Sequence, residues 1–77
     1  MEAVLAVRRG DVVRFVPEAR SRRISVVVDA VTFVGLELAM IHGIRLNANG
    51  CIDSQSRPHA WPIRRSAMVD IQPADND

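Results

Sequence analysis

The stretch that decides the fold runs from residue 36 to residue 46 and reads Leu-Glu-Leu-Ala-Met-Ile-His-Gly-Ile-Arg-Leu. Its apolar side chains recur with a period of two, which is typical of a β-strand with one face against a core. An α-helix would instead place Glu37 on the same stripe as Met40 and Ile44, a poorer separation of polar from apolar residues. Gly43 within this strand indicates a bulge or a sharp bend, as small barrels need at their corners.

The remaining strands are predicted from β-branched residues and from the turns between them. Residues 24–33 are rich in valine, whose branched side chain fits a pleated sheet. Asn49-Gly50 is typical of a type I′ hairpin, because both central residues of that turn need a positive φ. Pro62 restricts its strand to the edge of a sheet. The predicted strands are residues 12–16, 24–33, 36–46, 51–52, 60–63 and 69–71, with a turn of 3₁₀ helix at residues 64–68.

This order of elements resembles the SH3-like small barrels over residues 8–72. The resemblance rests on the polar loop after the first long strand and on the helical turn before the last strand. It implies an all-β fold, a small antiparallel barrel of five to six short strands with a 3₁₀ turn before the last strand. The core is then expected to contain Val13, Phe15, Val26, Val28, Leu38, Met40, Ile44 and Leu46.

Length and composition limit the possible classes of protein. A chain of 77 residues makes one small domain, which we place at residues 1–72, followed by an acidic tail at residues 73–77. Cys51 is the sole cysteine, so no internal disulfide is possible. The first residues do not resemble a signal peptide, and no apolar run approaches the length of a membrane span. We therefore expect a cytoplasmic protein with no membrane partner.

The residue types needed for catalysis or metal binding are present, but their spacing matches no known pattern. His42, Cys51, Asp53 and His59 do not follow the spacing of zinc ligands, and a second cysteine is missing. Cys51 and His42 provide a nucleophile and a base, but nothing in the sequence provides an oxyanion hole. We therefore expect no enzyme activity, no cofactor and no metal.

The arginines lead to the first of two functional hypotheses. All ten basic residues other than histidine are arginines, and residues 1–69 hold ten arginines against six acidic residues. Two clusters stand out, one in the loop of residues 17–23 and one around residues 57–65. An arginine offers a phosphate a bidentate hydrogen-bonding fork, and a tryptophan offers a base a stacking surface. A barrel that binds DNA or RNA would then use Arg20, Arg22, Arg23, Arg57, Trp61, Arg64 and Arg65.

The second hypothesis is a protein-interaction module. Val27, Val31 and Ile41 are expected on the face opposite the core, where they would need a covering partner. That partner would be another protein or a second copy of this chain, and the arginines would form a polar rim. Either function suits a small accessory or host-inhibitor protein of a phage or mobile element.

Overall fold

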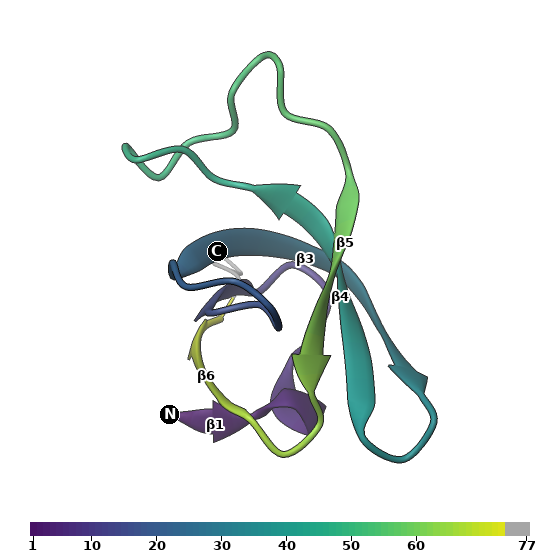
Figure 1. Cartoon of the computed structure of the whole chain (residues 1–77). Coiled ribbons are helices and arrows are strands. Elements are labelled where there is room, and N and C mark those ends of the chain that lie inside the picture. Colours follow the sequence, from purple (N-terminus) through teal and green to yellow (C-terminus); the bar gives the residue numbers. More distant parts are fainter. Residues whose placement is uncertain (74–77) are drawn as a thin grey trace.

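The protein folds as one antiparallel β-sheet of six strands, according to the computed structural model, which describes residues 1–73 (Figure 1). Across the sheet the strands follow the order β1-β6-β2-β3-β4-β5. The helical content of the described residues is one short 3₁₀ helix, η1, so the all-β prediction is confirmed. The elements are β1 (Glu2–Ala3), η1 (Val4–Ala6), β2 (Val12–Phe15), β3 (Ile24–Val34), β4 (Leu38–Arg45), β5 (His59–Arg64) and β6 (Met68–Gln72).

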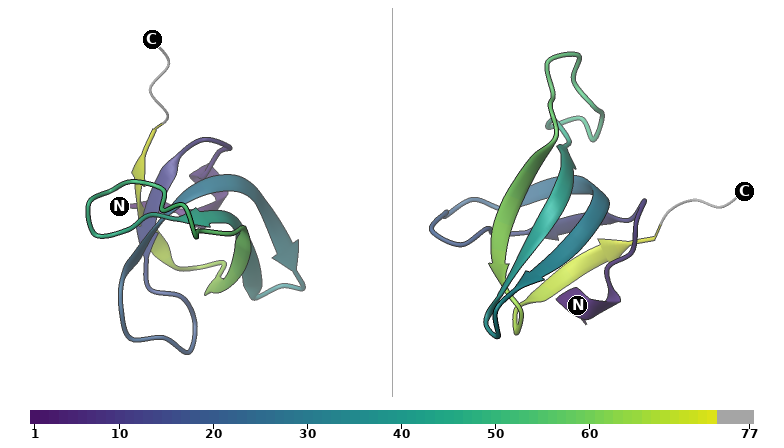
Figure 2. Two further views of the ribbon diagram at one scale, coloured as in Figure 1. Left: turned by 90° about the horizontal axis from the view of Figure 1, so that it is seen from above. Right: turned by 90° about the vertical axis from the view of Figure 1, so that its right-hand side faces the viewer.

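The sheet curls around its core but stays open (Figures 1 and 2). Strands β2 to β5 pair in sequence as a meander, and β6 returns to pair with β2. The short β1 pairs with β6, and within residues 1–73 the two edge strands β1 and β5 form no ladder with each other. Pro62 lies in the edge strand β5, as its missing N–H requires.

A β-bulge in the β3–β4 hairpin changes which side chains of β3 face the core. The register shifts between Val28 and Ala30, so Asp29 is an extra residue in the pairing. Val28 is buried before the bulge, and Val31 packs against the core after it. Val31 therefore does not lie on the face opposite the core, as the uninterrupted alternation of the sequence had predicted. One extra residue is enough to exchange the two faces of a strand.

The inward face of β4 is the opposite of the one predicted. Ala39 and Ile41 are fully buried, whereas Leu38 is 39% exposed. Both rows of β4 contain apolar residues, so alternation alone did not decide which row faces inward. The inward row also contains Gly43, where an added Cβ would overlap the carbonyl oxygen of Val27. The small residues of this row let β4 approach β3 closely inside the curl, and the predictions that Ile41 faces outward and Leu38 inward are wrong.

The observed core lies inside the curled sheet and draws on every element except the short β1. The buried positions predicted on β2 and in the first half of β3 are confirmed, whereas Met40, Ile44 and Leu46 are only half-buried. η1 adds Val4, which is 1% exposed. The buried apolar residues are Val4, Val13, Phe15, Ile24, Val26, Val28, Ala39, Ile41, Ile63 and Val69.

The predicted turn at Asn49-Gly50 and the strand predicted after it differ from those observed. Gly50 has a φ of 77°, but Asn49 lies outside the positive-φ region, so a type I′ turn is wrong. The hydrogen bonds from Gly50 N to Asn47 O and from Asn47 N to Cys51 O instead close a three-residue hairpin loop. The predicted fourth strand is a single bridge between Leu46 and Ile52.

The predicted 3₁₀ turn before the last strand is replaced by a tight turn. The Ala67 N–H donates to Arg64 O over 3.0 Å, which reverses the chain between β5 and β6 without a helical segment. The predicted acidic tail at residues 73–77 lies, apart from Pro73, outside the described residues. In residues 1–73 no helix has the length and hydrophobicity that crossing a bilayer requires.

Candidate functional site

Two long loops flank the beginning of β5 and enclose a groove. Residues 16–23 connect β2 to β3, and residues 46–58 connect β4 to β5. The right panel of Figure 2 shows the 46–58 loop projecting at the top, where β5 begins, and the 16–23 loop projecting at the left, beside β5. The space between the loops is a hollow of about 1000 Å³.

This hollow, which we call the arginine groove, gathers guanidinium groups from four separate segments. The 16–23 loop supplies three of them, β2 and the end of β4 supply one each, and the 46–58 loop supplies one. Because the strands bring these segments to one place, residues distant in sequence form one positively charged surface. The arginines that line the groove are Arg14, Arg20, Arg22, Arg23, Arg45 and Arg57.

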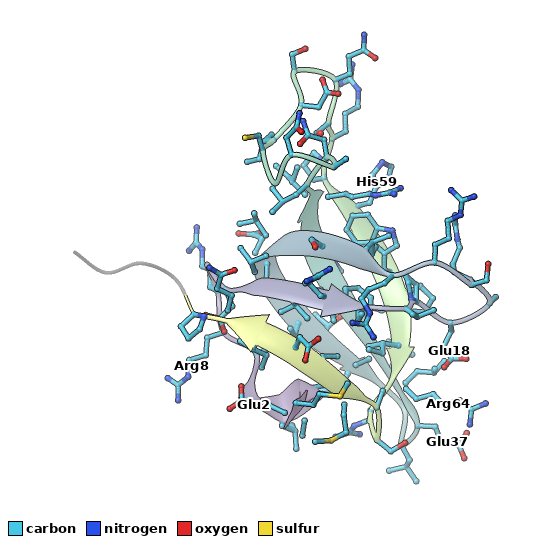
Figure 3. The ribbon with its side chains drawn as sticks, turned by 90° about the vertical axis from the view of Figure 1, so that its left-hand side faces the viewer. Glu2, Arg8, Glu18, Glu37, His59 and Arg64 are labelled. Atoms are coloured by element: carbon cyan, nitrogen blue, oxygen red, sulfur yellow. The ribbon has the colours of Figure 1, made fainter. Side chains whose placement is uncertain are left out.

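Two aromatic rings also line the arginine groove. His59 and Trp61 are two residues apart on β5 and therefore point to the same face of the sheet. Their ring centroids are 5.7 Å apart, with an angle of 60° between the ring planes. Trp61 packs partly against the core, whereas His59 is exposed where the 46–58 loop joins β5 (Figure 3). The groove thus combines six arginines with two aromatic rings.

The acidic residues that line the groove are already engaged within the protein. Glu18 forms an ion pair with Arg64, with 3.2 Å between Oε1 and Nε. Asp53 Oδ1 accepts hydrogen bonds from the Ser54 hydroxyl and from the Gln55 N–H. Six arginines against two carboxylates in the lining leave the groove positively charged.

The 16–23 loop is held near both of its ends. The Glu18 N–H donates to Pro62 O over 2.9 Å, and the Arg20 N–H donates to Pro17 O over 3.1 Å. Ala19 has a φ of 63°, a conformation that costs a residue with a Cβ more than it costs glycine. Farther along the loop, Arg23 lies 3.5 Å from Asp70 of β6. The loop is therefore fixed to β5 at one end and near β6 at the other.

The 46–58 loop is ordered by side chains that mimic backbone turns. Asn47 Oδ1 accepts hydrogen bonds from the N–H groups of Asn49 and Cys51, over 2.9 and 3.0 Å. In the second half of the loop, the Asp53 N–H donates to the Ser56 hydroxyl over 3.2 Å, and the Ser56 N–H donates to Asp53 O. Short polar side chains commonly stabilise loops in this way. The wall that carries Arg57 is therefore preformed.

The structure separates the seven predicted nucleic-acid contacts into two groups. Five of them line the arginine groove: Arg20, Arg22, Arg23, Arg57 and Trp61. Arg64 and Arg65 lie outside it. Arg64 pairs with Glu18, while the Arg65 guanidinium lies 4.5 Å from the centre of the Phe33 ring and donates to Gly35 O.

Three groove residues were not predicted from the sequence. Arg14 and Arg45 are isolated arginines in strands, and His59 was considered only as a metal ligand. The predicted strand alternation contained the relevant signal for Arg45, because it placed Arg45 at the end of the strand that precedes the 46–58 loop. Clustering along the sequence cannot find such residues, since only the pairing of the strands brings them together.

The residues of the protein-partner alternative do not form one surface. Ile41 is buried and Val31 packs against the core, so of the three predicted residues only Val27 lies on the outward face, where it is half-buried. It pairs there with Ile44. The outward side of the β3–β4 hairpin also carries Leu38 and Met40, which the sequence had placed in the core.

The residues considered for metal binding or catalysis remain apart from one another. In the described part of the chain, no three His, Cys, Asp or Glu side chains are placed so that they could hold a metal ion. Cys51 is exposed on the 46–58 loop rather than in a strand. His42 Nε2 lies 2.9 Å from the Thr32 hydroxyl on the outward face of the hairpin. Comparison with models of protein families, with curated proteins and with solved structures gives no match to this chain.

Proposed function

We propose that this protein binds nucleic acid by placing the phosphate backbone of DNA or RNA in the arginine groove. The observation that carries this proposal is the convergence of six arginines from four chain segments on one hollow beside Trp61. Convergence is more informative than arginine content, because scattered surface arginines would serve solubility equally well. Guanidinium groups form bidentate, charge-assisted hydrogen bonds with phosphate oxygens.

We also propose that the curled sheet is an open variant of the SH3-like small barrel. The return of β6 to β2 after a meander of four strands supports this assignment. The hydrogen bond from Glu18 N to Pro62 O supports it further, because it links the 16–23 loop to the edge strand β5. In this architecture the loop after the first long strand borders the binding groove, as it does here.

Salt-dependent binding provides the most direct test. In residues 1–73, the salt bridges of the groove arginines are limited to that between Arg23 and Asp70, which leaves about five arginines for phosphates. Each neutralised phosphate contributes about −0.9 to the slope of log K against log salt on a duplex and about −0.7 on a single strand. We therefore expect slopes of about −4.5 and −3.5, respectively, in fluorescence anisotropy titrations of labelled oligonucleotides.

A pair of matched variants separates the groove from general charge. Arg20→Ala combined with Arg22→Ala removes two groove arginines and is expected to reduce the magnitude of the slope by about 1.4 to 1.8. Arg8→Ala combined with Arg65→Ala removes the same charge from positions that do not line the groove. This control is expected to leave the slope within about 0.3 of the wild-type value.

Two results of the same titrations would contradict the proposal. If the wild-type protein retains neither duplex nor single strand at low salt, nucleic-acid binding is excluded. If both double variants weaken binding equally, the groove is not the site. If no nucleic acid binds, light scattering tests the alternative that the protein self-associates. The candidate surface for self-association is the outward row of β4, where Leu38 is exposed.

A further inference from the structure

A second hollow, of about 680 Å³, lies on the outward side of the β3–β4 hairpin next to the arginine groove. Its floor includes Val27 and Ile44, which face each other across the two strands. Its wall includes Ile52 and Pro58 of the 46–58 loop. Ile52 is 55% exposed, so its side chain adds accessible apolar surface to this wall. We call this space the apolar hollow.

The rim of the apolar hollow is polar and is built on the bulge of β3. Asp29, the extra residue of the bulge, pairs with Arg9 at 3.4 Å between Oδ1 and Nε. His42 lines the hollow from β4, next to Gly43, where an added Cβ would overlap the Val27 carbonyl oxygen. Bulges recur beside binding sites, where they redirect a side chain. The hollow thus offers an apolar interior and, at its edge, both donors and acceptors.

The two hollows share lining residues at the edge of the sheet. His59 and Ala60, at the beginning of β5, line both of them. His59 contacts Trp61 on the groove side and stands where the 46–58 loop meets the sheet (Figure 3). Trp61 and His59 pair with the inward row of β4, whereas Val27 and Ile44 lie on the outward side. A flexible chain lying along the arginines would therefore turn around the edge strand β5 at His59 to reach the apolar hollow. The arginine groove can hold the charged backbone of a flexible polymer. The apolar hollow suits an uncharged, flat group attached to that backbone.

We infer that the apolar hollow receives an unpaired base of a single-stranded nucleic acid whose phosphates lie in the arginine groove. This inference rests on the proposed function and narrows it to single strands. A base has two apolar faces, which suit a floor and wall of aliphatic residues and proline, and a polar edge, which suits Arg9, Asp29 and His42. A duplex keeps its bases stacked and paired inside, so it can use the groove but not the hollow.

The test compares two substitutions that add the same negative charge at exposed apolar positions. Ile52→Asp alters the wall of the apolar hollow, and Leu36→Asp alters the tip of the β3–β4 turn, where Leu36 is 92% exposed and lines neither hollow. Both residues are exposed, so both variants are expected to fold. Binding is measured at one low salt concentration with single-stranded oligo(dT), single-stranded oligo(rU) and a mixed-sequence duplex of equal length.

We expect the wild type to prefer the single strands, with little difference between deoxyribose and ribose. Ile52→Asp is expected to weaken single-strand binding by about 10-fold, the loss that follows from removing one aliphatic side chain that the base would bury. It is expected to weaken duplex binding no more than Leu36→Asp does. Thermal unfolding of both variants confirms that they are folded.

Two other results separate a failure of the inference about the apolar hollow from a failure of the proposed function. If duplex and single strands bind equally well and the two variants behave alike, the inference about the apolar hollow is overturned while the proposed function stands. If no oligonucleotide binds, the proposed function itself fails, and the inference fails with it.

Discussion

Replacing Ile41 by alanine tests which face of β4 lies against the core. Ile41 is fully buried, pairs with Val31 of β3 on one side and with Trp61 of β5 on the other, and has little room to relax. Truncation of such a residue costs about 2–5 kcal/mol, and a position packed between two strands belongs in the middle of that range, about 3–4 kcal/mol. Leu38→Ala is the matched control. Leu38 is already 39% exposed, so its truncation is expected to cost about 1 kcal/mol or less.

Urea denaturation followed by tryptophan fluorescence measures both costs. The chain contains one tryptophan and no tyrosine, so the emission reports on Trp61 alone, next to the substituted position. For a domain of this size, the dependence of the unfolding free energy on urea, m, is about 1 kcal/mol/M. Ile41→Ala is therefore expected to lower the urea midpoint by about 3–4 M and Leu38→Ala by about 1 M or less. If Ile41→Ala unfolds the protein completely, Ile41→Val, with an expected cost of about 0.5–1.5 kcal/mol, keeps the comparison measurable.

The order of the two urea midpoints decides which row of β4 faces the core. If Leu38→Ala lowers the midpoint as much as Ile41→Ala or more, the inward row of β4 is the one predicted from the sequence. The register with β3 and the exposure of the outward row would then be incorrect as well, because a slip of one residue exchanges the two faces together.

Two further changes probe the backbone. Gly43→Ala is expected to destabilise the protein by about 1–3 kcal/mol, because the new methyl group would overlap the Val27 carbonyl oxygen; an unchanged urea midpoint would contradict the close approach of β4 to β3. Ala19→Gly is expected to stabilise it by up to about 1 kcal/mol, because glycine adopts the observed φ of 63° without strain; a lower midpoint would contradict that conformation of the loop.

The all-β fold could be predicted from local sequence patterns. The face of β4 that lies against the core could not. Alternation over residues 36–46 correctly indicated a strand, and valine content correctly indicated its neighbour. Alternation gives the inward face only when one row is clearly more polar than the other. In β4 both rows are apolar, and the steric requirement at Gly43 fixes the inward row. That requirement comes from the backbone of β3, so it is not visible in the sequence of β4 itself.

The candidate site was predictable to the extent that its residues are adjacent in sequence. The cluster at residues 20–23 was found because three arginines occur in four positions. Arg14 and Arg45 were missed because each reaches the groove through the pairing of its strand. Arg65 was assigned to the groove because a turn after β5 was expected to face it; instead, Arg65 lies on Phe33 at the turn between β3 and β4.

The features that made the sequence hard to interpret are the ones that build the second hollow. A regular β3–β4 hairpin would have no extra residue at Asp29 and no need for a glycine at position 43. Both irregularities line the apolar hollow, and both weaken a sheet that has a thin core. The bulge and the glycine also let the hairpin bend, as the curled sheet requires. The bulge, the glycine and the exposed Ile52 occur together beside the arginine groove, which is where an unpaired base would enter.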